Sequence, residues 1–191
     1  MIGITGKHSS IIKEFVKLTD EKAVFGSINE LPKDLEQYVL CAGVLAGKNA
    51  RDIDDAEAIQ TFRVNFLDVV RFCDELFEKN ARARVCAIGS MSGILGSYDT
   101  AYAGSKAALH LYIETKKLLH PTQHLVCVAP TIIEDSGMTQ RRADLEEVLQ
   151  RGKQRRLQRW LRAEEVARIA HFALQEDALC NTVVRATGGN W

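Results

Sequence analysis

The sequence predicts an α/β fold, a doubly wound parallel sheet with helices on both faces, and two observations favour it. Six short apolar or β-branched runs recur along the chain. Longer stretches with helical periodicity separate them, which is typical of parallel strands joined by helices. With 191 residues, 46% of them hydrophobic, the chain can bury one sizeable core. We therefore expect residues 1–191 to form a single domain with about six strands.

Each element follows from its own sequence pattern. The expected strands cover residues 1–5, 22–26, 37–41, 83–88, 123–129 and 181–186. The first helix has Ser9 or Ser10 as its N-cap, and a long second helix begins after Asp54 or Asp55 and carries apolar residues as far as Phe77. Further helices are expected over residues 100–119, 140–162 and 163–175.

Composition and charge argue against several classes of function. A formal net charge of zero argues against a general attraction to nucleic acid or anionic membranes. No apolar run approaches the roughly 18 residues of a membrane span, so the protein is expected to be soluble and cytoplasmic. Five scattered cysteines are expected to be buried reduced thiols, neither disulfides nor metal ligands: Cys41, Cys73, Cys86, Cys127 and Cys180.

Three side chains, Ser90, Tyr102 and Lys106, can act on a carbonyl or an alcohol. On a helix, Tyr102 and Lys106 lie one turn apart on one face, so the Lys106 ammonium can favour the Tyr102 phenolate. A phenol in that setting can exchange a proton with an alcohol oxygen. Ser90 ends the fourth expected strand, where its hydroxyl can hydrogen-bond the same oxygen. A bare Tyr-x-x-x-Lys match is more often a helix surface pair, so the surrounding residues decide.

Those surroundings resemble the catalytic segment of the short-chain dehydrogenase/reductase family. Residues 102–108 read Tyr-Ala-Gly-Ser-Lys-Ala-Ala, close to the family's Y-x-A-S-K-A-A run. Other family landmarks recur in order, in segments 3–6, 40–43, 63–66, 125–130 and 183–189. The resemblance implies a Rossmann-like fold and an NAD(P)-dependent oxidoreductase that interconverts a carbonyl and a secondary alcohol on a small-molecule substrate.

The resemblance also implies the roles of individual residues. Tyr102 would be the acid/base, Ser90 would hold the substrate oxygen, and Lys106 would bind the nicotinamide ribose. Asn65 would hold a water that links Lys106 to solvent, and Ser92 is a rival to Ser90. The implied cofactor-binding residues are Gly6, Lys7, Ser9, Ser10, Ser27, Ala42, Gly43, Tyr102, Lys106, Pro130 and Ile132. A metal site is not expected.

The glycine-rich turn departs from the family pattern. In the family it reads T-G-x-x-x-G-x-G, whereas residues 5–12 keep only Gly6. Side chains at Ser10 and Ile12 oppose a close approach of the backbone to a pyrophosphate and close packing of the helix on the sheet. Ser9, Ser10 and the free amides at the helix start can still bind a phosphate, and Lys7 can add positive charge.

The region after the second strand bears on cofactor type and on chain length. No acidic residue occupies the expected place for the ribose 2′-hydroxyl of NAD, and Ser27 with Lys7 can meet a 2′-phosphate, so NADP is favoured over NAD. Only about a dozen residues then remain before Tyr38, which barely suffices to join two parallel strands. We expect the fold to lack one strand-helix unit of the family, on its adenine side.

The segment after Pro130 generally supplies the substrate lid in this family. Here it carries eight basic residues: Arg141, Arg142, Arg151, Lys153, Arg155, Arg156, Arg159 and Arg162. Such a concentration can receive a phosphorylated or nucleotide-linked substrate, or the acidic surface of an acyl carrier protein. A solvated helical face interleaved with acidic residues is the plainer interpretation.

Self-association and a second class of function also follow from the resemblance. Relatives form homodimers or homotetramers through the helices that carry Asn65 and Tyr102, and Trp191 is a candidate to cover either a subunit boundary or the rim of the active site. Four phenylalanines exceed what one buried stripe requires and support this: Phe62, Phe66, Phe72 and Phe77. The altered glycine turn supports an alternative, a catalytically weak or inactive relative that serves as a nucleotide-binding or scaffold partner. The retained catalytic residues favour the enzyme.

Overall fold

The computed structural model describes residues 1–189. Its sheet has six parallel strands. In chain order they are β1 (Ile2–Thr5), β2 (Lys22–Phe25), β3 (Gln37–Leu40), β4 (Arg84–Ile88), β5 (His124–Pro130) and β6 (Thr182–Ala186). Their order in space is β2-β1-β3-β4-β5-β6, and the predicted α/β fold is confirmed. Asn190 and Trp191 lie outside the described residues, and so does the expectation for Trp191.

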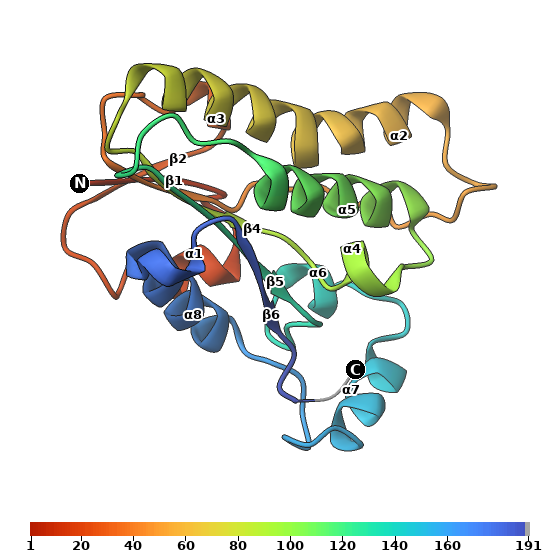
Figure 1. The fold of residues 1–191 in the computed structure, drawn as a ribbon. Coiled ribbons are helices and arrows are strands. Elements are labelled where there is room, and N and C mark those ends of the chain that lie inside the picture. The colour runs from red at the N-terminus through yellow and green to blue at the C-terminus, as the bar shows by residue number, and fades with distance from the viewer. Residues whose placement is uncertain (190–191) are drawn as a thin grey trace.

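Helices cover both faces of the sheet (Figure 1). On one face lie α1 (Ser10–Phe15) and α8 (Ala163–Gln175), and on the other lie α2 (Asp55–Phe62), α3 (Asp68–Lys79) and α5 (Thr100–Thr115). Each face has its own apolar core, since Phe15 packs with the α8 alanines and Leu76 packs with Tyr38 of β3. Phe15 and Leu76 are completely buried, and each such side chain contributes about 2 kcal/mol.

The connection from β2 to β3 is shorter than a helical crossover. These two strands flank β1, yet residues 26–36 between them hold only the 3-10 turn η1 (Ile28–Glu30). Ile28 and Leu31 are buried and fasten the connection to the core, and Ser27 Oγ accepts the Asn29 N–H at 3.2 Å. Because no further strand follows on this side, β2 is an edge of the sheet.

The predicted long second helix is interrupted. A π-helical turn, η2 (Arg63–Leu67), separates α2 from α3 and carries Asn65. Such turns insert one extra residue into a helix and are frequent at functional sites. Of the four phenylalanines predicted to exceed a buried stripe, Phe72 and Phe77 lie in the core, so they provide no exposed face. The exposed apolar side chains on these helices are instead Ile59 and Leu67.

Two other helices are shorter than predicted. The third expected helix ends at Thr115 because the Asn181 side chain donates to the carbonyl oxygens of Ile113 and Lys116, at 2.7 and 3.0 Å. Residues 140–162 hold one helix, α7 (Leu145–Lys153), after which the chain reverses. Trp160 returns onto α7, and its indole N–H donates to the Val148 carbonyl oxygen at 2.6 Å. Tertiary packing therefore overrides helix propensity there.

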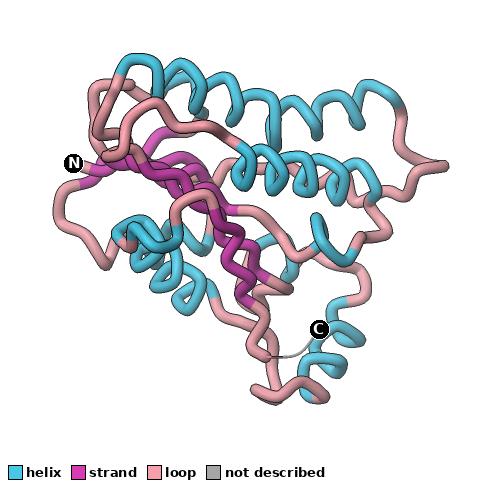
Figure 2. Tube along the Cα trace, viewed as in Figure 1, coloured by secondary structure: helices cyan, strands magenta, loops and turns pink. Residues whose placement is uncertain are grey.

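Three short helices complete the chain: α4 (Ser92–Leu95), α6 (Gly137–Gln140) and η3 (Asp177–Leu179). The long connection between β3 and α2 has no regular structure (Figure 2). All five cysteines are free. Within residues 1–189, no helix is both long and apolar enough to cross a membrane, and no group of three or more His, Cys, Asp or Glu side chains could hold a metal ion.

Candidate active site

A cavity of about 890 Å³ opens at the carboxyl ends of the strands. Its volume lies in the upper part of the range for ligand pockets. The walls include twelve residues predicted from the sequence: Gly6, Lys7, Ser9, Ser10, Ser27, Ala42, Gly43, Ser90, Tyr102, Lys106, Pro130 and Ile132. These residues come from segments far apart in the chain, and parallel strands bring them to one edge of the sheet. Asn65 lies behind this wall.

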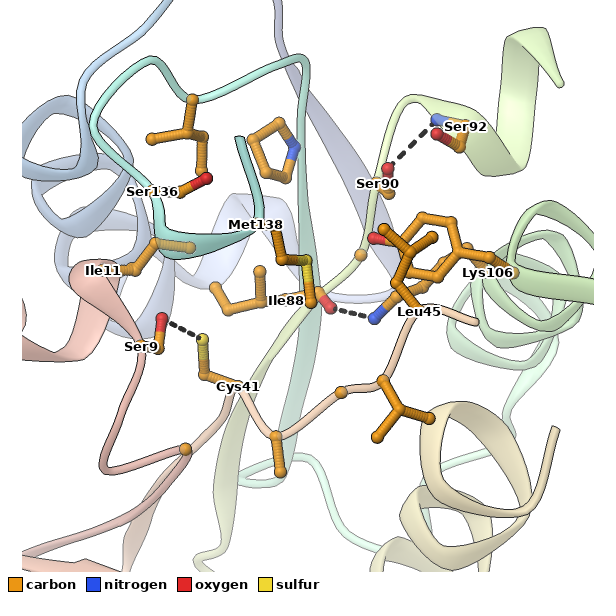
Figure 3. A pocket seen from close by; sticks show the side chains of 18 of the residues that line it. Ser9, Ile11, Cys41, Leu45, Ile88, Ser90, Ser92, Lys106, Ser136 and Met138 are labelled. Carbon is orange, nitrogen blue, oxygen red and sulfur yellow. Dashed lines mark hydrogen bonds between the residues drawn. The ribbon is translucent and has the colours of Figure 1, made fainter. Parts of the chain in front are cut away.

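Lys106 provides a buried positive charge in the wall. Its side chain, on α5, is 5% exposed, and Nζ donates to the Ile88 carbonyl oxygen at 2.8 Å (Figure 3). Among the described residues this is its one hydrogen bond, and no carboxylate forms an ion pair with it. An ammonium has three donors, so two remain for a ligand in the cavity. A buried charge without a counter-ion is costly and indicates a binding role.

The start of α5 fixes the position of Tyr102. Asp99 is fully buried at the N-cap, where Oδ1 accepts the Tyr102 N–H and Oδ2 accepts the Gly47 N–H, both at 2.8 Å. One carboxylate thus ties the loop after β3 to the helix that carries the tyrosine. Lys106 Nζ lies 5.9 Å from the centre of the Tyr102 ring, and the Tyr102 side chain is partly exposed to the cavity.

Ser90 follows β4 directly and is oriented by its neighbours. Its Oγ accepts the Ser92 N–H at 3.1 Å, which leaves the hydroxyl proton available to another acceptor (Figure 3). The Ser90 N–H donates to Nε2 of the buried His110 at 3.4 Å. Both serines line the cavity, but the Ser92 amide acts here as a support for Ser90.

His110 was not predicted from the sequence, although it lies one turn after Lys106 on α5. It fits because Gly89 and Gly93 have no side chain, and a Cβ at Gly93 would lie 2.9 Å from the imidazole. Burial, with the positive charges of Lys106 and Arg185, lowers the pKa of His110 to about 4. The neutral ring can therefore accept the Ser90 N–H at physiological pH.

Asn65 holds the loop after β3 from behind the cavity. Its Oδ1 accepts the Val44 N–H at 2.8 Å, and Nδ2 donates to the Val44 carbonyl oxygen at 2.9 Å and to Ser105 Oγ at 3.1 Å. A Cβ at Gly43 would lie 3.2 Å from Asn65 Oδ1 and 3.7 Å from Lys106 Nζ. Gly43 therefore leaves open the space in front of both side chains.

The turn after β1 keeps one necessary glycine. Gly6 has φ +88°, and a Cβ there would lie 2.9 Å from the carbonyl carbon of Cys41. Ser9 is the N-cap of α1, but its Oγ accepts from Cys41 Sγ at 3.3 Å and makes no capping bond, so amides of the first turn stay free. Ser10 Oγ donates to the Asp135 carbonyl oxygen at 3.2 Å. Ile12 points into the core and does not block the turn.

The end of β2 holds an acidic group that sequence reasoning missed. Glu30 is four residues beyond the position where an acid was expected, but η1 folds it back, and its Oε2 accepts the Gly26 N–H at 3.1 Å. Lys7 Nζ reaches the same place, 3.5 Å from where a Cβ at Gly26 would lie. Lys7, which lines the cavity, and Glu30, which lies just outside its lining, therefore meet at the end of β2. Glu30 was missed because it lies four residues beyond the expected position.

The segment after β5 closes over the cavity. Met138 lines it from α6, Arg141 and Arg142 line it from the two residues after α6, and Arg151 lines it from α7. Ser136 lines the cavity and is the N-cap of α6, where its Oγ accepts the Thr139 N–H at 3.2 Å. The sequence shows how many basic residues this segment has, but it does not show which of them line the cavity.

Comparisons with known proteins identify relatives of this fold. A family model for short chain dehydrogenases matches residues 9–147. A short-chain dehydrogenase/reductase family oxidoreductase from Burkholderia thailandensis superposes with a TM-score of 0.80 at 17% identity, over 98% of this chain and 91% of that one. A short-chain dehydrogenase/reductase from Brucella melitensis, described as a glucose/ribitol dehydrogenase, gives 0.81 at 17%, over 98% and 95%. The aldohexose dehydrogenase of Thermoplasma acidophilum gives 0.80 at 17%, over 98% and 92%. No curated protein matches.

Proposed function

Because the chain belongs to the short-chain dehydrogenase family, we propose that it is an NAD(P)-dependent oxidoreductase that interconverts a carbonyl and a secondary alcohol on a small-molecule substrate. One observation carries this proposal. Ser90, Tyr102 and Lys106 open into the same cavity, which also reaches the glycine turn at the start of α1. A site for proton exchange and a site for a dinucleotide are therefore continuous.

The residues present fit a nicotinamide dinucleotide. Lys106 has two unused donors in the cavity, which suit ribose hydroxyls, and Gly43 leaves space beside it. The free amides at the start of α1, with Ser9 and Ser10, suit the pyrophosphate. Ala42, Pro130 and Ile132 complete the apolar walls. When bound, the nicotinamide supplies or takes the hydride.

The proton is handled by the protein. Tyr102 gives a proton to the substrate oxygen in reduction and takes it in oxidation. Ser90 directs its hydroxyl proton to the same oxygen, because its acceptor side is occupied by the Ser92 amide. Lys106 stabilises negative charge that develops on the phenol. Asn65 fixes the loop at Val44. Its place in the family pattern gives it the further role of holding a water that links Lys106 to solvent.

Substituting Tyr102 tests the chemical role. Tyr102→Phe should lower turnover by at least about 10²-fold, because only the proton donor is lost. Affinity for the dinucleotide and the melting temperature should stay nearly unchanged. Tyr112→Phe is the matched control on the same helix. It loses the hydrogen bond from Oη to Asp74, at 2.7 Å, and should lower the melting temperature while keeping turnover. Unchanged turnover in Tyr102→Phe would contradict the role.

We favour NADP as the cofactor. Ser27 can donate its hydroxyl proton, since its oxygen already accepts the Asn29 N–H, and Lys7 adds charge at the end of β2. Glu30 opposes this preference, because a carboxylate repels a 2′-phosphate. Separate titrations with NADPH and NADH, followed by nicotinamide fluorescence, decide the matter. Tighter NADH binding that is reversed in Glu30→Gln would make Glu30 the determining residue.

The same titrations test the alternative, a nucleotide-binding or scaffold partner without catalysis. Two glycines of the family turn are absent, and Ser9 and Ser10 already hydrogen-bond Cys41 and Asp135. If neither dinucleotide binds, the scaffold becomes the better assignment. Saturable binding instead supports the enzyme.

A homodimer or homotetramer in the cytoplasm is the proposed state of the protein. Ile59 on α2 and Leu111 on α5 are 66% and 63% exposed, and these helices are neighbours, which supports an apolar interface there. Free cysteines support a reducing compartment. A monomer in light scattering at high protein concentration would contradict self-association.

A further inference from the structure

Of the eight basic residues of the segment after β5, five lie outside the cavity lining and three belong to it. Three of those five have structural side-chain contacts: Arg155 stacks on the Trp160 ring at 4.4 Å, Arg156 donates to the Gly188 carbonyl oxygen, and Arg159 pairs with Glu165. Arg162 is the N-cap of α8, where its backbone N–H donates to Glu165. Lys153 ends α7 and is exposed, away from the cavity. The other three, Arg141, Arg142 and Arg151, line the cavity.

Among the described residues, two of these three guanidinium groups pair with a carboxylate, and it is the same one. Arg142 makes two hydrogen bonds of 2.7 Å to Asp144, and Arg151 lies 3.7 Å from the same carboxylate. Arg141 forms no ion pair with any described residue, and its guanidinium lies over Gly137 at the start of α6. Two positive charges therefore remain uncompensated at this part of the wall.

Acidic groups on the rest of the wall do not balance this charge. Among the described residues that line the cavity, Asp68 is the one carboxylate, and it already lies 3.9 Å from Arg63 and 4.0 Å from Arg71. Unpaired guanidinium donors on this wall are therefore available to an incoming anion. The planar donor geometry of guanidinium suits carboxylate and phosphate groups best.

The arginines lie on the substrate side of the cavity. The adenosine end, at Lys7 and Gly26, lies at the end of β2, whereas the segment that carries the arginines follows β5, and β1, β3 and β4 lie between these two strands. Arg142 is close enough to Tyr98 to interact with it electrostatically, and Tyr98 belongs to the loop between Ser90 and Tyr102. An anion held by Arg142 therefore lies beside the loop between Ser90 and Tyr102.

We propose that Arg141, supported by Arg142 and Arg151, binds an anionic group, a carboxylate or a phosphate, carried by the carbonyl or alcohol substrate. This proposal rests on the proposed oxidoreductase function. It names the substrate class as small oxo acids or phosphorylated carbonyl compounds with their alcohols. Arg142 is held in place by Asp144, whereas Arg141 is free to close on the ligand.

Matched pairs of carbonyl compounds test the proposal. 4-Oxopentanoate is compared with its methyl ester, and dihydroxyacetone phosphate with dihydroxyacetone, so that one pair reports a carboxylate and the other a phosphate. Binding is measured by calorimetry and turnover by nicotinamide absorbance, in the wild type, Arg141→Gln, Arg141→Lys and Lys153→Gln. Lys153→Gln removes the same charge from the same segment outside the cavity.

The anionic member of at least one pair should bind more tightly than its neutral partner in the wild type. Arg141→Gln should weaken that anion roughly tenfold and raise its KM with little change in kcat, Arg141→Lys should recover part of the loss, and Lys153→Gln should behave as the wild type. If neither anion is preferred, or if Arg141→Gln weakens NADPH as much as the anion, the proposal is wrong.

These outcomes separate the anion site from the proposed function. Arginine-dependent binding of an anion without turnover would leave the site standing and contradict the oxidoreductase. Turnover of acid and ester with equal kcat/KM, unaffected by Arg141→Gln, would support the oxidoreductase and overturn the anion site.

Discussion

Gly6 shows how one residue sets the geometry of the cavity floor. Its φ of +88° lies in the region that favours glycine, and its Cα faces the backbone of Cys41 and Ala42, where β3 ends. Two strands therefore approach each other as closely as backbones allow at the place where the first helix begins. The other two glycines of the family turn are replaced in this chain. At Gly6, both the positive φ and the close backbone contacts require a residue without a side chain.

Substituting two glycines separates these reasons. Gly47 has a similar φ of +73°, but a Cβ there would have its nearest contact at 3.6 Å, with Tyr98 Oη, whereas at Gly6 it would meet backbone atoms at 2.9 to 3.1 Å. Gly47→Ala should cost about 1 kcal/mol of unfolding free energy, and Gly6→Ala about 2 to 4 kcal/mol, because the strand ends must also separate. Urea unfolding of both variants measures the difference. Equal losses would mean that the strand ends yield easily.

At the scale of elements, α2 depends on its N-terminal capping box. Asp54 Oδ1 accepts the Glu57 N–H at 2.8 Å, and the Glu57 carboxylate in turn accepts the Asp54 N–H. Glu57 also pairs with Lys48 at 2.6 Å, which joins the irregular loop after β3 to the helix. The cap therefore stabilises both the helix and the loop that borders the cavity.

Replacing the cap residue tests this coupling. Asp54→Ala should lower the unfolding free energy by about 1 kcal/mol, because an amide of the first turn loses its acceptor. Asp54→Asn keeps an acceptor oxygen and should cost a few tenths of a kcal/mol at most. Hydrogen exchange should show faster opening of the first turn of α2 in the alanine variant. A loss of the same size in both variants would point to the charge of Asp54 as the source.

Element prediction from the sequence succeeded where local pattern and tertiary packing agree. The runs of all six strands form parallel pairs, and their bounds are confirmed to within one residue. The central strands are largely buried, whereas the edge strands β2 and β6 are partly exposed. The π-helical turn at Asn65 was missed because periodicity of apolar residues is nearly the same on both sides of it. The predicted helix over 140–162 was too long, because packing of Trp160 on α7 is not visible in local propensity.

At the scale of the molecule, parallel topology explains how much of the candidate site was predictable. Most wall residues inferred from the resemblance lie at or just after the end of a strand, so placing the strands was enough to bring them together, and Tyr102 and Lys106 join them from one face of α5. Glu30, His110 and the inward arginines were not foreseen, because each depends on a fold-back or a helix face that local pattern does not specify. The supporting residues of a site are thus harder to predict than its reactive groups.

Two buried histidines make the stability of the whole molecule depend on pH. Burial is the main cause that lowers the pKa of His124, and it lowers the pKa of His110 to about 4 with the help of Lys106 and Arg185. Between the ordinary histidine pKa of about 6.5 and pH 4, the unfolded chain binds a proton that the folded protein excludes at His110. Stability is therefore complete above about pH 6.5 and falls as the pH decreases through this window.

Replacing His110 should remove part of this dependence. Between about pH 7.5 and 5, the wild type should lose about 2 kcal/mol of unfolding free energy through His110 alone. His110→Gln keeps an acceptor for the Ser90 N–H and has no proton to bind, so its destabilisation relative to wild type should shrink by that amount over the same range. His124 is present in both proteins and cancels. His120→Gln, at an exposed position, should keep the wild-type dependence. If the difference in unfolding free energy between wild type and His110→Gln were the same at every pH, the imidazole would already bind its proton in the folded state.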